Sequence, residues 1–178
     1  TYKSYGTSVQ HLGGVSLMPG EEGEPPATIN TSYSDYHTGV FQPVAIMGAL
    51  MRRRLTGQPA TMESSIFKSG ALTAGPALLD FQSTGRMPQR MGNRDPNAAP
   101  HGVYRCQGDD RWCAIAVQSA DQWSAFCQAI GNPDWSGEDA FSTLESRLAN
   151  QGRLDELVGE WTIGQTAEDA MARLQEAG

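Results

Sequence analysis

A turn-rich segment divides the chain into two stretches with different hydrophobic patterns. Residues 83–101 (STGRMPQRMGNRDPNAAPH) combine prolines and glycines with polar residues and show neither helical nor strand periodicity. A structureless segment of this length is uncommon inside a domain and is usually a linker or a binding loop. We therefore expect one domain over residues 1–82, a linker or mobile loop over 83–101 and a second domain over 102–178.

The first stretch has the spacing of helices. From about residue 36 to residue 55, apolar residues recur at intervals of three and four positions, which is typical of one helix face. Gly57 supplies a stop. Shorter helices are expected over residues 4–14 and 65–81, the latter broken at Gly75-Pro76. Residues 18–30 are expected to form a loop and residues 61–64 a short strand.

The second stretch mixes strand-like and helical runs. Residues 103–106 and 112–117 flank the polar sequence QGDD and predict a β-hairpin. Three helices are expected after it: one capped by Ser119, one over about 142–162, and one capped by Thr166. The sequence thus predicts an α/β protein, in which a helical part of a larger domain precedes a small α+β domain.

Composition excludes several classes of function. The net charge of −7 argues against nucleic-acid binding, which needs clustered cations. The sequence has no apolar run of about eighteen residues and no signal peptide, so we expect a cytoplasmic protein without a membrane segment. No CxxC pair occurs and the histidines are scattered, so no metal site is expected. The cysteines are Cys106, Cys113 and Cys127, and the histidines are His11, His37 and His101.

Asp35 is an isolated carboxylate at the start of the long predicted helix. Its nearest acidic neighbours in the sequence are Glu24 and Glu63. An Asp before a helix commonly accepts hydrogen bonds from the first free amides, which stabilises by about 1 kcal/mol. Alternatively, the carboxylate could attack an acyl thioester to form a mixed anhydride, with helix-end amides keeping it ionised. The local sequence favours the cap but leaves both interpretations open.

Several segments of the chain occur in an order that is typical of one enzyme family. They are residues 3–14 (KSYGTSVQHLGG), residues 33–35 (YSD) followed by Gly39, residues 49–57 (ALMRRRLTG), and residues 91–104 (MGNRDPNAAPHGVY). Together they resemble the family III CoA-transferases, the group that includes formyl-CoA and carnitine CoA-transferases. The match includes that family's tyrosine-bearing segment, its aspartate and helix, its ALxxRxxTG signature, and the mobile loop that opens its small domain.

The resemblance implies roles for individual residues. The aspartate that matches Asp35 is the family's nucleophile, which carries the acyl group and then CoA in covalent intermediates. Lys3 would lie near bound CoA and Tyr5 would line the acyl site, although a solvated lysine and a packed aromatic remain alternatives. Backbone amides of Gly92 and Asn93 would close over the intermediate. No metal or redox cofactor is implied, since CoA enters as part of the substrate.

Two other functions stay open. Related acyl-CoA racemases carry a histidine at the position of Tyr5, so the tyrosine favours the transferase. A non-catalytic assembly domain of the same fold is the other alternative. The resemblance further implies a homodimer of interlocked subunits, acyl-CoA and carboxylic acid substrates, and additional CoA-binding and C-terminal parts outside these 178 residues. We therefore expect the segment alone to be inactive.

Overall fold

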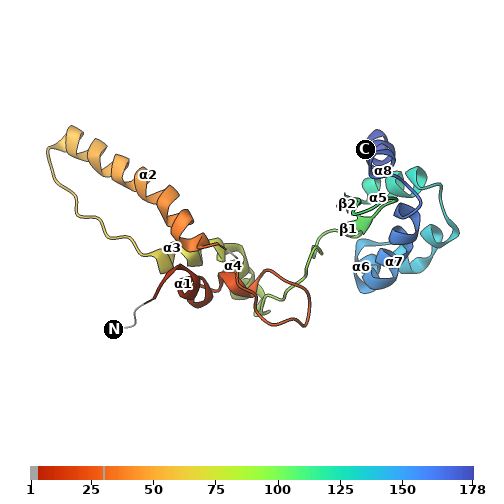
Figure 1. Ribbon diagram of the computed structural model, residues 1–178, viewed down its shortest axis with the longest axis horizontal. Coiled ribbons are helices and arrows are strands. Elements are labelled where there is room, and N and C mark those ends of the chain that lie inside the picture. Colours follow the sequence, from red (N-terminus) through yellow and green to blue (C-terminus); the bar gives the residue numbers. More distant parts are fainter. Residues whose placement is uncertain (1–3, 30) are drawn as a thin grey trace. The chain divides into compact units, whose positions relative to one another are not determined.

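The computed structural model describes residues 4–29 and 31–178 (Figure 1). Its contacts divide the chain into two units, Thr1–Gly92 and Asn93–Gly178. Helices make up most of both units, and the second also contains a two-stranded antiparallel sheet. The predicted α/β class, with a helical part followed by an α+β part, is confirmed.

The first unit is helical throughout its described elements. These are α1 (Gly6–Leu12), the 3-10 helix η1 (Val15–Leu17), α2 (Tyr33–Thr56), α3 (Ile66–Thr73) and α4 (Gly75–Thr84). The strand predicted over residues 61–64 is wrong, because these residues have no regular structure. A strand needs a partner for its backbone groups, and the described part of this unit contains none.

The ends of these helices follow from local residues. Gly57 takes the left-handed conformation (φ 68°) and donates its N–H to Arg53 O at 2.8 Å, as expected for a glycine stop. Ala74 separates α3 from α4, and a proline occupies the first turn of α4, where its missing N–H costs little. The predicted break at Gly75-Pro76 is therefore confirmed.

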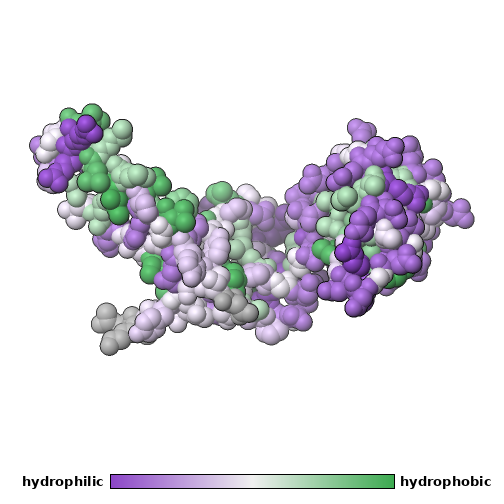
Figure 2. Space-filling view, turned by 45° about the horizontal axis from the view of Figure 1, so that its top comes forward, coloured by the Kyte–Doolittle hydropathy of each residue, from purple (hydrophilic) through white to green (hydrophobic). Residues whose placement is uncertain are grey.

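The long helix α2 exposes most of its apolar side chains. Figure 2 shows hydrophobic residues gathered along it. The same is true of several apolar residues of α3 and α4. In the described residues of this unit, the buried side chains cluster where α1, η1 and the first turns of α2 meet α3. The exposed large apolar residues of α2 are Tyr33, Tyr36, Val40, Phe41, Val44, Ile46, Met47, Leu50, Met51 and Leu55.

The second unit is built around a β-hairpin and three longer helices. Its elements are β1 (His101–Arg105), β2 (Trp112–Ala116), α5 (Ala120–Ala129), the 3-10 helices η2 (Asp134–Gly137) and η3 (Asp139–Phe141), α6 (Leu144–Ala149), α7 (Gln151–Thr162) and α8 (Ala167–Ala177). The predicted hairpin is confirmed, with Tyr104 opposite Cys113. Side chains of Ser119 and Thr166 cap α5 and α8, as predicted.

The helix predicted over residues 142–162 is two helices. Asn150 separates α6 from α7 with a non-helical backbone (φ −111°, ψ 22°). Its side chain donates to Ser146 O at 2.8 Å. Asparagine competes in this way for the groups that a helix would use, which explains the break.

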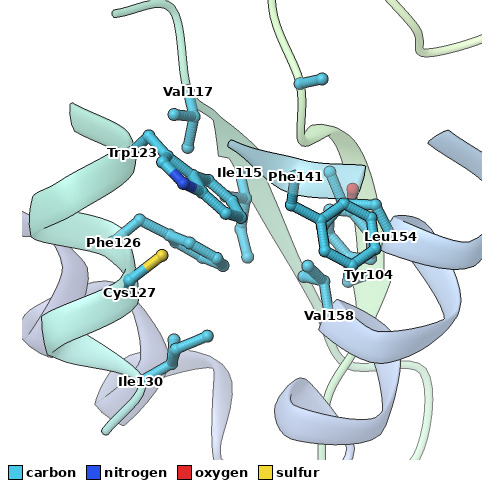
Figure 3. Packing of buried hydrophobic residues seen from close by; sticks show 11 residues of the cluster. Tyr104, Ile115, Val117, Trp123, Phe126, Cys127, Ile130, Phe141, Leu154 and Val158 are labelled. Atoms are coloured by element: carbon cyan, nitrogen blue, oxygen red, sulfur yellow. The ribbon is translucent and has the colours of Figure 1, made fainter. Parts of the chain in front are cut away.

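A single apolar core holds the second unit together (Figure 3). Aromatic residues of α5 face the hairpin on one side, and Phe141, Leu154 and Val158 close the other side. Arg147 is buried in the same region. It donates to Ala99 O at 2.8 Å and to Phe141 O at 3.1 Å, and its guanidinium lies 4.5 Å from the ring centre of Trp123.

The segment predicted as a linker or mobile loop is held at both ends. Helix α4 includes residues 83 and 84. Towards the other end, Ala99 is fully buried and donates its N–H to Val117 O at 3.1 Å. The Val117 N–H in turn donates to Pro100 O at 2.9 Å. Residues 93–101 thus pack as part of the second unit.

Candidate functional site

Asp35 lies within the first turn of α2. The helix begins at Tyr33, so its cap position is Ser32, whose side chain makes no capping hydrogen bond. The interpretation of Asp35 as the residue at the N-terminal cap position of the helix is therefore wrong. Asp35 is half-buried, and its main-chain N–H donates to Ser32 O at 2.9 Å. A negative charge in this turn interacts favourably with the helix dipole.

Glycine at position 6 allows the Asp35 carboxylate to lie against α1. A Cβ atom built on Gly6 would overlap Asp35 Oδ2, and it would lie 2.7 Å from Ser32 Oγ. Gly6, the first residue of α1, therefore lies directly against the first turn of α2. The Asp35 carboxylate can therefore occupy its observed place only because residue 6 has no side chain.

A second close approach holds the same turn from α3. A Cβ on Gly70 would lie 2.5 Å from Ser34 Oγ and 3.8 Å from Val15 Cγ2. Ser34 is fully buried, and its carbonyl accepts a hydrogen bond from Thr38 Oγ1 at 2.7 Å. The start of α2 is thus wedged between α1 and α3, with Asp35 on the side of α1.

Sequence reasoning missed Gln10, which contacts the same turn. Gln10 is fully buried; its Oε1 accepts from Tyr33 N at 2.7 Å, and its Nε2 donates to Ile29 O at 3.4 Å. The one local signal is the four-residue interval between Gly6 and Gln10, which places them on the same face of α1. The partner, 23 residues away, is not visible in the sequence.

The other predicted site residues lie in different surroundings. Lys3 lies outside the described residues. Tyr5 precedes α1 and its side chain is 83% exposed. Gly92, in the left-handed conformation (φ 57°), donates its N–H to Gly20 O at 3.0 Å. Asn93 belongs to the second unit, where its carbonyl accepts a hydrogen bond from His101 Nδ1 at 2.5 Å.

The structure therefore brings Gly6 against Asp35 and Gln10 to Tyr33 in the same turn, but it gives Gly92 a partner in the loop after η1. Within residues 4–29 and 31–178, no arginine, lysine or histidine forms an ion pair with Asp35. A half-buried carboxylate without a competing cation can act as a nucleophile or as a base. No three His, Cys, Asp or Glu side chains in those ranges gather in a way that could hold a metal ion.

In the described part of the chain, no helix is both long and apolar enough to cross a bilayer.

Comparison with known proteins gives consistent matches. The sequence model of CoA-transferase family III matches residues 1–178. A succinyl-CoA–D-citramalate CoA-transferase of Chloroflexus aurantiacus is 27% identical over 98% of this chain and 43% of its own length. An acetyl-CoA:oxalate CoA-transferase of Acetobacter aceti is 33% identical over 86% of this chain and 39% of its own length.

Solved structures agree with these sequence matches. The crystal structure of a CaiB/BaiF family protein from Brucella suis superposes with a TM-score of 0.86 at 27% identity, covering 98% of this chain and 46% of that protein. The chain thus spans less than half the length of these relatives.

Proposed function

Because the chain belongs to CoA-transferase family III, we propose that it takes part in moving CoA from an acyl-CoA donor to a carboxylic acid, with Asp35 as the covalent carrier. One observation carries the proposal: the carboxylate sits in the first turn of α2 with Oδ2 against Gly6, where a side chain is absent. The family resemblance assigns this role to the same residue by its position in the sequence. The local geometry favours Asp35.

The reaction needs no oxidant and no net proton transfer. The Asp35 carboxylate attacks the thioester carbon of the donor, which forms a mixed anhydride and releases CoA as a thiolate. The thiolate then attacks the Asp35 carbonyl, giving an aspartyl-CoA thioester and the free donor acid. Attack by the acceptor carboxylate and a second return of the thiolate reverse these two steps, releasing the new acyl-CoA and regenerating Asp35.

Nearby groups have supporting roles in this proposal. The N-terminal end of α2 favours negative charge at Asp35 and on oxygens formed beside it. Tyr5, directly before Gly6, would line the acyl site, and Lys3 would lie near CoA. Gly92 and Asn93 would cover the intermediate. The Gly92 N–H is donated to Gly20 O, so its use in catalysis would require that hydrogen bond to break.

The complete enzyme is proposed to be larger and dimeric. The relatives are more than twice as long as this chain, and we propose that further parts supply most of the CoA site. The apolar side chains of α2 that are exposed in this chain support the proposal, because other parts of a homodimer could cover them. On this proposal the 178 residues alone would be inactive. A cytoplasmic location stays a prediction.

Hydroxylamine trapping tests the proposal. The complete protein is incubated with succinyl-CoA or acetyl-CoA, the donors in the relatives' names, and hydroxylamine is added before peptide mass spectrometry. We expect a hydroxamate at Asp35 and no transfer by the Asp35→Asn variant. The exposed Asp80 provides a matched control, and Asp80→Asn should retain transfer.

Three results would contradict the proposal. Transfer without any hydroxamate at Asp35 would exclude the carrier role. Exchange of an α-proton of the acyl-CoA with solvent, in the absence of an acceptor acid, would instead identify a racemase or epimerase. Full activity of the Asp35→Asn variant would leave only a structural role for this residue.

A further inference from the structure

A single buried side chain from α1 binds the start of α2. Gln10 has an exposed fraction of 0%, and it accepts from the Tyr33 N–H and donates to Ile29 O. The two hydrogen bonds have opposite polarity, so together they fix which end of the amide is oxygen. Gln10 therefore binds the first N–H of α2, while the Ser32 side chain at the cap position makes no capping hydrogen bond.

Gln10 and Gly6 contact the same turn of α2. They are four residues apart on α1 and share one face of that helix. Gly6 lies against Asp35 Oδ2, while Gln10 binds the Tyr33 N–H one half-turn earlier. Any rotation or sliding of α2 along α1 would change both contacts together. The position of the Asp35 carboxylate is thus coupled to the hydrogen bond of Gln10.

We propose that Gln10 is a positioning residue for Asp35. The inference rests on the proposed function of Asp35 as the nucleophile, and it assigns no contact between Gln10 and substrate. Reacting groups need to be held within about 0.5 Å of their productive position, which rigid neighbours achieve. Gln10 supplies this support through the backbone of Tyr33, and Gly70 supplies it from the side of α3.

Removing Gln10 should shift the turn without unfolding it. The Tyr33 N–H also lies 2.8 Å from Thr31 O, so it keeps an acceptor when Gln10 is replaced. Methionine has nearly the volume of glutamine but neither hydrogen bond. Burial favours the protonated form of a glutamate at this position, which keeps an oxygen for the Tyr33 N–H and an O–H that can donate to Ile29 O, the acceptor of the longer bond, 3.4 Å.

The test uses the complete protein with Gln10→Met, Gln10→Glu and the matched control Gln128→Met, whose glutamine is exposed on α5. We expect Gln10→Met to lower kcat on the order of tenfold to a hundredfold, as misplacement by about 1 Å can do, with KM for acyl-CoA unchanged. Gln10→Glu should restore most of kcat. Amide hydrogen exchange of residues 31–38 should quicken in Gln10→Met and stay unchanged in Gln128→Met.

Several outcomes would overturn the proposal. They are a wild-type kcat in Gln10→Met, an equal loss in Gln10→Glu, or a loss of folded protein by circular dichroism that accounts for all lost activity. Asp35→Asn is measured in parallel. If it retains transfer, the proposed function fails, and hydrogen exchange still decides whether Gln10 holds the start of α2. If it abolishes transfer while Gln10→Met is unchanged, only the positioning role fails.

Discussion

Replacement of Arg147 by methionine should strongly destabilise the second unit. Arg147 is 2% exposed, and burial lowers the pKa of its guanidinium below the ordinary value. Its two acceptors, Ala99 O and Phe141 O, belong to residues that are fully buried. Methionine would fill similar space with no donor. Both carbonyls would then lose the hydrogen bonds that Arg147 gives them.

The size of the effect follows from these contacts. A buried carbonyl left without a donor costs about 1–3 kcal/mol, and two are affected. Removing a buried charge regains part of this, because the guanidinium no longer has to be desolvated. We expect the free energy of unfolding to fall by about 2–4 kcal/mol. For a unit of this size, the melting temperature should fall on the order of 10–30 °C.

Tryptophan fluorescence during urea unfolding measures this change in the second unit alone. All four tryptophans (Trp112, Trp123, Trp135 and Trp161) lie within it. Arg105→Met is the matched control, because Arg105 is exposed and lies 5.6 Å from the ring centre of Trp112. Loss of such an exposed contact should cost at most about 1 kcal/mol. Equal effects of the two substitutions would refute the reasoning about buried carbonyls.

Three further predictions concern the second unit. Burial, and then the hydrogen bond to Asp155, raise the pKa of Tyr104 above its ordinary 10.0. The preference of the folded state for the neutral hydroxyl therefore stabilises the unit below pH 10, and this stabilisation is lost as pH rises further. Tyr104→Phe should reduce the alkaline decrease in the free energy of unfolding measured with urea. Burial raises the pKa of Cys113 and of the other two thiols. A disulfide reagent at neutral pH should therefore modify all three slowly in the folded protein and quickly in urea, and in the folded protein the half-buried Cys113 should react before the other two. Gly152→Ala, in open space on α7, should raise the free energy of unfolding by about 0.5–1 kcal/mol, whereas Gly131→Ala (φ 92°) should lower it.

Local residue patterns predicted the elements whose boundaries depend on near neighbours. The stop at Gly57, the break at Gly75-Pro76 and the hairpin of β1 and β2 all depend on residues next to them in the chain. The division of residues 142–162 was missed because apolar spacing continues through Asn150, whose side chain ends α6. The helical spacing of apolar residues was overridden there by a side-chain hydrogen bond.

The candidate site could be predicted only in part. Asp35 stood out because it is isolated in the sequence, and the family resemblance supplied its role. The contacts that hold it join residues far apart: Gly6 to Asp35, Gln10 to Tyr33, and Gly70 to Ser34. Such contacts depend on how three helices pack, and no spacing within one helix encodes them. The start of α2 at Tyr33, which excludes the cap interpretation, also depends on them.

In the proposed homodimer, the exposed apolar side chains of α2 would make the two units respond differently to protein concentration. A helix that leaves Val44, Leu50 and Leu55 uncovered gains stability from any surface that covers them, and such binding obeys mass action. The second unit is closed around its own core, so we expect its stability to depend less on such binding. On dilution, helical signal from α2 should therefore decline while tryptophan fluorescence of the second unit stays constant.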